Sequence, residues 1–234
     1  MGVDLVMSLE WASFAVRLDG PAEKTGYGGD ERALREGAAY HSMEGSLSSG
    51  LRELANPARS ASWTFSNPKQ GQMIQHYAVG KHAWANGSRP ANEKFVACEN
   101  EGVAGEALTD SQVANLIELT VWLYTTQEWT TLTRLITLWE HNEMTRFGSA
   151  PTACPSDRIP WTTIISGAER IIEQEADMTP YLAWDRDKQR IYLVGPWGAT
   201  WITTAKDVKK LEELYGKLDV GFSHATLTAL DPKA

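Results

Sequence analysis

Cysteine is scarce in this sequence, and basic residues are outnumbered by acidic ones. The 234 residues include two cysteines, Cys98 and Cys154, so they allow at most one bridge, and a disulfide framework is excluded. The formal net charge of −8 argues against non-specific electrostatic binding of a polyanion. We therefore expect no nucleic-acid partner.

The sequence also has no long apolar run and no export signal of the usual form. No stretch is long enough to span a bilayer. The N-terminal segment lacks the basic region that opens a secretory signal peptide, and Glu10 interrupts its apolar run. We expect a protein that does not insert into membranes and that carries no signal peptide.

Several common catalytic motifs are missing as well. There is no G-x-S-x-G turn, which disfavours a Ser-His-Asp hydrolase. There is no G-x-x-x-x-G-K-[ST] loop, which disfavours phosphate binding. His141 is preceded by Glu140 and followed by Asn142, so the H-E-x-x-H pattern of one metalloprotease class is absent too.

Tryptophan, in contrast, is abundant. The length suits one sizeable domain, alone or with a small appendage. We expect most of the tryptophans in the core or in cleft walls, with several available to line a groove for a sugar or a peptide. The ten are Trp11, Trp63, Trp84, Trp122, Trp129, Trp139, Trp161, Trp184, Trp197 and Trp201.

Hydrophobic patterning and turn residues predict a mixture of strands and helices. Thr109 as N-cap and Gln112 three residues later form a capping box at the start of a long amphipathic helix. The pattern of predicted elements changes to short strands after residues 178–180, so we expect a main domain over 1–176 and a small module over 178–234. Strands are predicted at 38–41, 60–66, 73–77, 94–99, 181–184, 190–194 and 200–203, and further helices at 48–55, 161–176 and 205–215.

One stretch combines two good metal ligands. His141 ends an apolar run, and Cys154 follows it after a loop of Gly, Ser and Pro. Pro151 and Pro155 restrict the backbone on either side of the cysteine. Imidazole and thiolate are the commonest protein ligands for zinc, and the loop is long enough to bring the two side chains together.

A third ligand is expected from the histidines that precede this stretch. His41 is favoured because it ends a predicted buried strand, where its side chain can project from the edge of a sheet. His76 and His82 are the alternatives. Three ligands with wide sequence separation are typical of a catalytic zinc with an open position, whereas structural sites use four closely spaced ligands.

A catalytic carboxylate is predicted in the segment over residues 96–102. In an extended strand Glu99 and Glu101 point to the same side. A glutamate beside a zinc-activated water can take its proton and deliver it to a leaving amine. The alternative is that both are solvated charges at a strand end.

Several short segments of the chain occur in an order that resembles a known protein family. The chain carries HSMEGS, SWTFSNPKQGQMIQHY, HAWANG, Asn92, ACENEG, LTDSQ, EHNE and PTACPS in that order. This order is similar to that of the zinc-dependent N-acetylmuramoyl-L-alanine amidases, which include phage lysins, bacterial muropeptide amidases and peptidoglycan recognition proteins. The resemblance runs from about residue 38 to residue 161, and the segments are closest in style to phage lysins.

The resemblance implies an α/β fold with a central mixed β-sheet flanked by helices, followed here by a small C-terminal α+β appendage. It implies that His41, His141 and Cys154 bind Zn²⁺ and that Glu99 is the catalytic acid/base. The expected substrate is bacterial peptidoglycan, cut between N-acetylmuramic acid and L-alanine. A lysin of this kind would wait in the host cytoplasm until lysis.

Two departures from the family pattern concern further site residues. Thr152 stands where some relatives carry a lysine, and its hydroxyl or backbone N–H is expected to assist the oxyanion without supplying a cation. Relatives often show Trp-His-x-Gly where this chain has Trp84-Ala85-Asn86-Gly87. Trp84, Asn86 and Asn92 are therefore predicted as substrate-groove residues, with a core role for Trp84 as the alternative.

Other functions remain open at this point. A binding-only relative typically loses a zinc ligand, usually the cysteine, and Cys154 is present here. A virion component that helps a phage tail to penetrate the wall is a further alternative. The aromatic-rich segment 178–234 is predicted either to target the wall or a partner, or to pack on the first domain.

Overall fold

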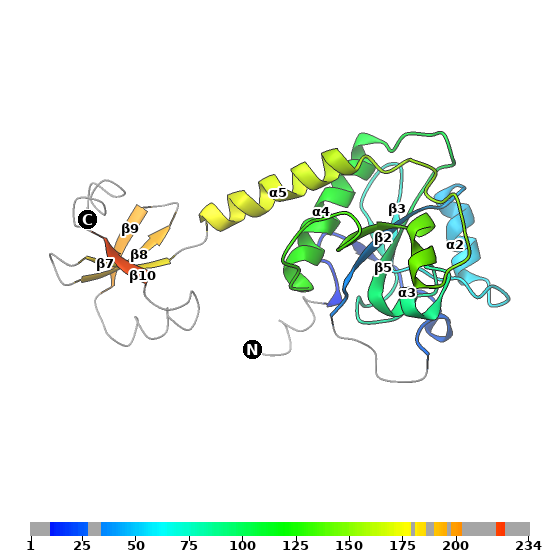
Figure 1. Ribbon diagram of the computed structural model, residues 1–234, viewed down its shortest axis with the longest axis horizontal. Coiled ribbons are helices and arrows are strands. Elements are labelled where there is room, and N and C mark those ends of the chain that lie inside the picture. The colour runs from blue at the N-terminus through cyan, green and yellow to red at the C-terminus, as the bar shows by residue number, and fades with distance from the viewer. Residues whose placement is uncertain are drawn as a thin grey trace. The chain divides into compact units, whose positions relative to one another are not determined.

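The chain was examined as a computed structural model, and its backbone is described for residues 10–27, 34–178, 181–185, 190–195, 198–202 and 219–222. Side chains are described for residues 10–27 and 34–174. The chain divides into two compact units, Met1–Glu169 and Arg170–Ala234 (Figure 1). Each unit has its own sheet.

The first unit is built on a mixed six-stranded sheet with the order β1-β4-β3-β5-β2-β6. Strands β3, β5, β2 and β6 run parallel to one another, whereas β4 is antiparallel to β3. The predicted central mixed sheet is thus confirmed. The bounds are β1 Val16–Arg17, β2 Gly37–Ser42, β3 Phe65–Asn67, β4 Ile74–Gln75, β5 Phe95–Asn100 and β6 Leu138–Glu140.

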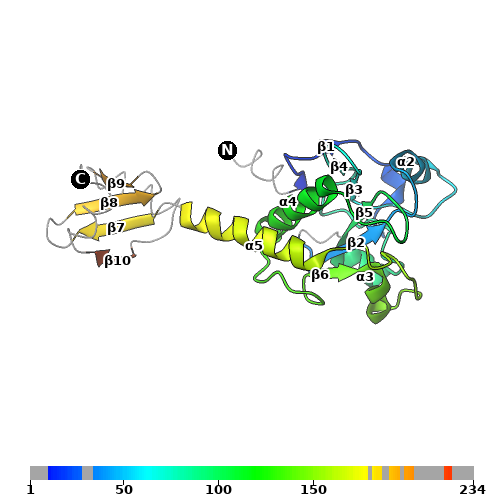
Figure 2. The ribbon, with the colours of Figure 1, turned by 90° about the horizontal axis from the view of Figure 1, so that it is seen from above.

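One face of this sheet is covered by the long helix α4, Asp110–Thr126 (Figure 2). Its predicted capping box is present, with Thr109 and Gln112 exchanging side-chain to backbone hydrogen bonds. Tyr40 points to this face, where its hydroxyl lies 2.7 Å from Thr120 Oγ1. Its ring stacks on Trp161, the first residue of helix α5, Trp161–Met178.

The opposite face is covered by shorter elements. Ala39 and Ala97 are register partners on β2 and β5, and they point to this side because neighbouring residues alternate along a strand. Ala39 packs with Ala91 and Met144, and Ala97 packs with Leu54. The covering elements are α2 Leu47–Ala55, α3 Arg89–Lys94 and the 3₁₀-helix η2 His141–Phe147, and a second 3₁₀-helix, η1, spans Ala22–Lys24.

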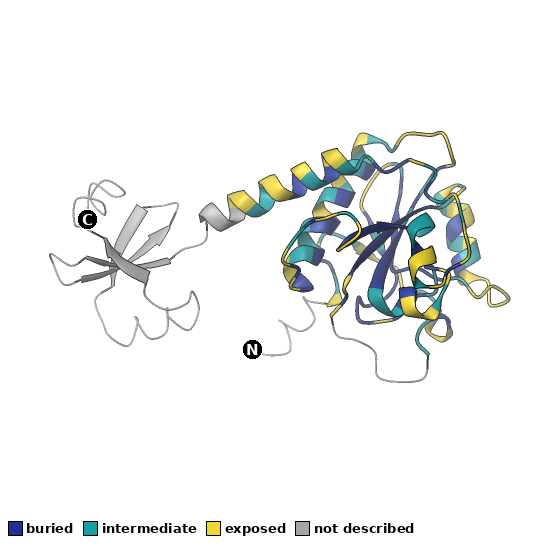
Figure 3. Cartoon of the chain, in the orientation of Figure 1, coloured by how far each residue is buried: buried dark blue, intermediate teal, exposed yellow. Residues whose placement is uncertain are grey.

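The strand register determines where polar side chains gather. His41 pairs with Glu99, and Ser42 pairs with Asn100, at the carboxyl ends of β2 and β5. β6 lies on the other side of β2 and ends at Glu140, so His141 follows at the same edge. Figure 3 shows these central strands as largely buried: β2 and β6 are buried along their length, and β5 at every residue except Glu99. Carboxyl ends of adjacent parallel strands are where α/β sheets place their ligand sites.

Some predicted boundaries differ from the observed ones. The strand expected over 60–66 begins only at Phe65, although Thr64 already donates its N–H to Ala97 O on β5. The strand expected over 73–77 is reduced to Ile74–Gln75. Helix α3 was not predicted. Within the described residues, no helix combines the length and the apolar character that crossing a membrane requires.

The second unit contains a four-stranded sheet with the order β10-β7-β8-β9. The strands predicted at 181–184 and 190–194 are present as a hairpin, in which β7 Tyr181–Asp185 and β8 Arg190–Gly195 pair antiparallel from Tyr181↔Val194 to Asp185↔Arg190. The predicted third strand is β9, Gly198–Ile202, while β10, Asp219–Phe222, pairs parallel with β7 and was not predicted. The helix predicted over 205–215 lies outside the described residues.

Candidate active site

His41, His141 and Cys154 come together at the carboxyl edge of the sheet. Their candidate ligand atoms all lie within 4.8 Å of one another. His41 comes from β2, His141 opens η2, and Cys154 lies in the loop after η2. The two imidazole rings have their centroids 4.5 Å apart and are tilted by 44°. The three residues predicted as metal ligands therefore form one cluster.

His41 is buried and held from two sides. Its Nε2 lies 2.9 Å from Asn86 Oδ1, and its carbonyl oxygen accepts a hydrogen bond of 2.8 Å from Asn100 Nδ2. Burial lowers the pKa of His41 well below its ordinary value, and the neighbouring His141 lowers it further. Burial also lowers the pKa of His141. Both rings are thus kept neutral, which is the form that binds a metal ion.

Cys154 is positioned by backbone contacts. The N–H of Ser42 donates to Cys154 Sγ at 3.1 Å, and the N–H of Asn142 donates to Cys154 O at 2.8 Å. Burial raises the pKa of Cys154 to about 12, and the carboxylate of Glu99 adds to the rise. Without a cation the sulfur is a thiol. A bound metal reverses that preference, because a coordinating thiol is deprotonated.

Arg158 ties the cysteine loop to the ends of the central strands. Its buried guanidinium donates to Ser42 Oγ at 2.7 Å and to the carbonyl oxygens of Glu101 and Glu106, each at 2.9 Å. The contact with Ser42 supports the residue whose N–H reaches Cys154 Sγ. No pattern in the sequence distinguishes Arg158 from a surface arginine, because its partners are mostly backbone carbonyls distant in the chain.

Glu99 lies beside this cluster, with its Oε1 atom 3.6 Å from His41 Nδ1. Its side chain is 15% exposed, and its Oε2 atom has no hydrogen-bond partner among the described residues. Burial raises the pKa of Glu99 to about 8, and the charge of Glu44 contributes to the rise. A buried carboxylate oxygen without a partner is costly unless a cation, a water molecule or a substrate proton meets it there.

The donor set fits a zinc ion. Two neutral imidazoles and one sulfur match the nitrogen and sulfur ligands that zinc prefers, and a site with three protein ligands leaves the fourth position open. A carboxylate in the position of Glu99, next to the cluster, is the type of group that hydrolytic zinc sites use as a proton acceptor.

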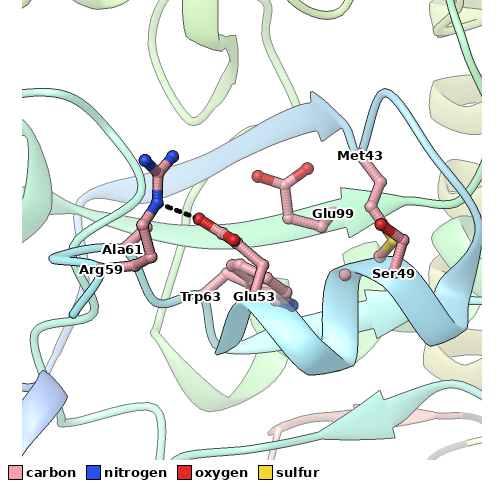
Figure 4. Close-up of a pocket in the computed structure, with 8 residues that line it drawn as sticks. Met43, Ser49, Glu53, Arg59, Ala61, Trp63 and Glu99 are labelled. Carbon is pink, nitrogen blue, oxygen red and sulfur yellow. Dashed lines mark hydrogen bonds and ion pairs between the residues drawn. The ribbon is translucent and has the colours of Figure 1, made fainter. Parts of the chain in front are cut away.

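A cavity of about 350 Å³ opens next to Glu99 (Figure 4). Glu99 stands on β5 and faces the space between α2 and the segment that carries Arg59 and Ala61. Glu53 and Arg59 form an ion pair at its rim. The buried ring of Trp63 forms part of its wall, together with Met43, Ser49 and Gly50.

Glu101 has a different environment from Glu99. Its carboxylate accepts hydrogen bonds from the backbone N–H groups of Leu47, at 2.9 Å, and Lys69, at 2.8 Å. It therefore connects the start of α2 to the loop after β3, and it is not among the residues that line the cavity.

The two alternative histidines lie elsewhere. His76 is buried with both ring nitrogens occupied, one 2.8 Å from Ser66 Oγ and the other 2.7 Å from Leu18 O. His82 is buried against the ring of Tyr27. Neither belongs to the cluster formed by His41, His141 and Cys154.

The polar groups of the residues predicted for the substrate groove form hydrogen bonds with other groups of the protein. Asn86 and Asn92 are 0% and 4% exposed, and the amide of Asn92 bonds to the backbone N–H of Asn86 and to the hydroxyl of Tyr27. The indole N–H of Trp84 donates to Gly26 O at 3.1 Å. The aromatic wall of the cavity is instead Trp63, which sequence reasoning did not single out.

Thr152 lies next to the cysteine in the same loop. Its Oγ1 accepts a hydrogen bond of 3.2 Å from the N–H of Cys154. The hydroxyl therefore stabilises the turn that presents the cysteine, and its own hydrogen remains available for a further acceptor.

Comparison with known proteins identifies the family and the fold of this chain. A family model described as N-acetylmuramoyl-L-alanine amidase matches residues 31–157. A search of curated proteins finds no match. Among solved structures, a selenomethionine derivative of AmpD matches at 19% identity with a TM-score of 0.52. The match covers 67% of this chain and 96% of the AmpD chain. The Staphylococcus aureus hydrolase AmiA, solved in complex with its ligand, matches at 13% identity and a TM-score of 0.52. The match covers 61% of this chain and 76% of the AmiA chain.

A further structure is similar at a lower level. The endolysin amidase LysCS from Clostridium intestinale shares 16% identity, with a TM-score of 0.49 over 68% of this chain and 98% of its own. At such identities the likeness to solved structures concerns the fold alone. The family model spans more than half of the chain, and the mixed sheet with its flanking helices matches the fold of AmpD and AmiA. The chain belongs to the N-acetylmuramoyl-L-alanine amidase family.

Proposed function

We propose that this protein is a zinc-dependent N-acetylmuramoyl-L-alanine amidase acting on bacterial peptidoglycan. The bond cut is the amide between the lactyl group of N-acetylmuramic acid and L-alanine of the stem peptide. The observation that carries this proposal is the placement of Glu99 beside the His41, His141 and Cys154 cluster, with one carboxylate oxygen that has no hydrogen-bond partner in the described part of the chain.

The chemistry follows from the proposed roles of these side chains. A zinc ion held by His41, His141 and Cys154 would polarise the scissile carbonyl and make a water molecule acidic near neutral pH. Glu99 takes the proton from that water as its oxygen bonds to the carbonyl carbon. Glu99 then delivers the proton to the nitrogen of L-alanine as the C–N bond breaks, so the same carboxyl group acts first as base and then as acid.

The cavity beside Glu99 is the proposed place for the substrate. It has an aromatic wall in Trp63 and a charged rim in Glu53 and Arg59. Because the protein carries a net charge of −8, long-range attraction to an anionic wall polymer is not expected. Binding must come from shaped local contacts of this kind.

A defined muramyl peptide tests the activity. Incubation of N-acetylmuramoyl-L-alanyl-D-glutamine with the zinc-loaded protein should yield free N-acetylmuramic acid and the L-alanyl dipeptide, identified by mass. Glu99→Gln, which retains the shape of the side chain, is the matched control and should give little product. Release of D-glutamine, or an intact substrate with fully zinc-loaded protein, would contradict the proposed bond.

The biological role proposed for this activity is that of a phage lysin acting on the cell wall. Its support is the order and style of the motifs between residues 38 and 161. A free lysin should be recovered from the soluble fraction of lysed host cells and not in purified virions. Recovery of the protein with phage particles would favour the virion-associated alternative.

A further inference from the structure

Asn86 is buried directly behind the ring of His41, and its amide is clamped from two directions. Its Nδ2 group donates to Ala91 O at 3.3 Å and to Phe95 O at 3.1 Å. Only an NH₂ group can satisfy two carbonyl oxygens, because a flipped amide would turn its own oxygen against them. The Oδ1 atom must therefore face His41.

This orientation fixes the tautomer of His41. Asn86 Oδ1 is an acceptor, so His41 Nε2, at 2.9 Å, has to carry the hydrogen and donate it. A neutral imidazole has one N–H and one bare nitrogen. The bare nitrogen of His41 is then Nδ1, which is the nitrogen that lies 3.6 Å from Glu99 Oε1.

The backbone around Asn86 is held as firmly as its side chain. Its N–H donates to Asn92 Oδ1 at 2.7 Å, and its carbonyl oxygen accepts from the hydroxyl of Ser149. Gly87 continues the turn with φ of 75°, and a Cβ atom there would lie 3.0 Å from Ser149 Cβ and 3.4 Å from His141 Nε2. The turn thus lies close to both histidines, and hydrogen bonds of the Asn86 backbone and side chain hold it in place.

We infer that Asn86 is a positioning residue that holds His41 in the Nε2–H tautomer and so presents His41 Nδ1 to the metal. This role rests on the proposed zinc site and replaces the predicted place of Asn86 in the substrate groove. Outer groups that bond to ligand histidines set both ring orientation and tautomer, and their loss typically lowers metal affinity about 10- to 100-fold.

The unmodified protein provides the first test. Long-range ¹H–¹⁵N correlation spectra of the metal-free protein distinguish a protonated from a bare ring nitrogen for each histidine, with His41→Gln used to assign the signals. We expect the Nε2 signal of His41 to be that of a protonated nitrogen and its Nδ1 signal that of a bare one. The Nδ1–H tautomer in this protein would overturn the inference.

A matched pair of variants provides the second test. Gln75 is also 0% exposed, and its amide likewise accepts one hydrogen bond, from Ala12 N, and donates two, to Glu10 O and Tyr77 O. Gln75→Ala removes an equivalent buried amide far from the metal ligands. In competition with a chromophoric chelator, Asn86→Ala should bind zinc about 10- to 100-fold more weakly than Gln75→Ala. In the spectra, His41 of Asn86→Ala should lose its single tautomer, while His41 of Gln75→Ala keeps it.

The outcomes separate this role from the zinc site itself. If the unmodified protein binds no zinc, the proposed function fails. If it binds zinc, and Asn86→Ala binds zinc as tightly as Gln75→Ala with the tautomer unchanged, the positioning role of Asn86 fails while the zinc site stands. Should Asn86→Ala not fold, the tautomer of the unmodified protein still decides.

Discussion

Among the individual residues, Glu99 differs from the neighbouring Glu101 in the hydrogen bonding of its carboxylate. Glu101, two positions later, has both carboxylate oxygens paired with backbone N–H groups, whereas Glu99 Oε2 has no partner among the described residues. Glu101 therefore holds the start of α2 to the loop after β3, whereas for Glu99 we propose the exchange of a proton with water and substrate.

The first prediction concerns these two carboxylates. Glu99→Gln should keep the fold and the zinc content but lower kcat by about 10²- to 10⁴-fold, because an amide cannot shuttle a proton. Steady-state kinetics on a soluble muropeptide, with zinc content measured in parallel, provide the test. Glu101→Gln should mainly lower the melting temperature. Equal losses of kcat in the two variants would contradict the assignment of Glu99.

The second prediction concerns Cys154. Cys154→Ser replaces a soft thiolate by a hydroxyl that zinc binds poorly, so metal retention should fall sharply. Equilibrium dialysis against a chelator measures this loss. Cys98→Ser is the control, since Cys98 is buried on β5 and is not one of the three clustered donors. If Cys98→Ser lost as much zinc as Cys154→Ser, the proposed ligand set would be incorrect.

The sequence predicted a candidate metal ligand where a histidine stands at the end of a predicted buried strand. His41 was favoured over His76 and His82 because it closes a buried strand, and the structure gives His76 two hydrogen-bond partners away from the cluster. The role of Asn86 could not be predicted in the same way. It depends on carbonyl oxygens of α3 and β5 that meet the amide only after folding.

Among the elements, the parallel strands β2, β5 and β6 do most to build the site. Their register brings His41 opposite Glu99 and delivers His141 to the same edge. Strong local signals predicted β2 and the capped start of α4, and both were found within a residue or two. Helix α3 is short, with Ser88 as its cap and a proline in its first turn, so it has too few residues to show a helical period.

The third prediction concerns pH and the strands β3 and β4. Burial lowers the pKa of His76 below its ordinary value of 6.5, so the folded protein holds this ring neutral. Between the two pKa values the unfolded chain binds more protons, and the free energy of unfolding therefore falls as pH is lowered through 6.5. This contribution is fully present above pH 6.5.

Urea unfolding of the metal-free protein between pH 7.5 and pH 5, a range of about one unit above and one and a half below that value, measures the effect. His76→Gln should lose less stability over this range than the unmodified protein does, because one protonation linked to unfolding has been removed. His41 and His141 also have lowered pKa values and remain in both proteins, so some pH dependence should persist. Identical slopes in the two proteins would contradict the linkage to His76.

For the whole molecule, the chain combines an amidase unit with a second unit of different architecture. The family match ends at residue 157, and the four-stranded sheet of the second unit lies beyond it. The sequence predicted two strands of this sheet, at 181–184 and 190–194, on either side of a short polar segment. It did not predict the pairing of β10 with β7, which joins residues 36 and 37 positions apart, Asp219 with Ala183 and Phe222 with Asp185, and leaves no local signal.

The fourth prediction concerns this second unit, for which we propose a role in binding the wall or a partner. A chain that ends at Ala176 keeps the part of α5 in which Ile164 and Ala168 are buried. It should stay soluble and cleave small muropeptides at the rate of the full chain, but sediment less with whole walls and clear them more slowly. Aggregation, or loss of activity on small substrates, would instead make residues 177–234 part of the catalytic fold.

The most direct test of the proposed zinc amidase is a digestion of purified peptidoglycan by the full chain. The untreated protein should release new alanine amino termini and no new reducing sugars. Treatment with a chelator should stop this release, and added zinc should restore it. New reducing sugars, amino termini other than alanine, or full activity in a protein proven free of metal would contradict the account.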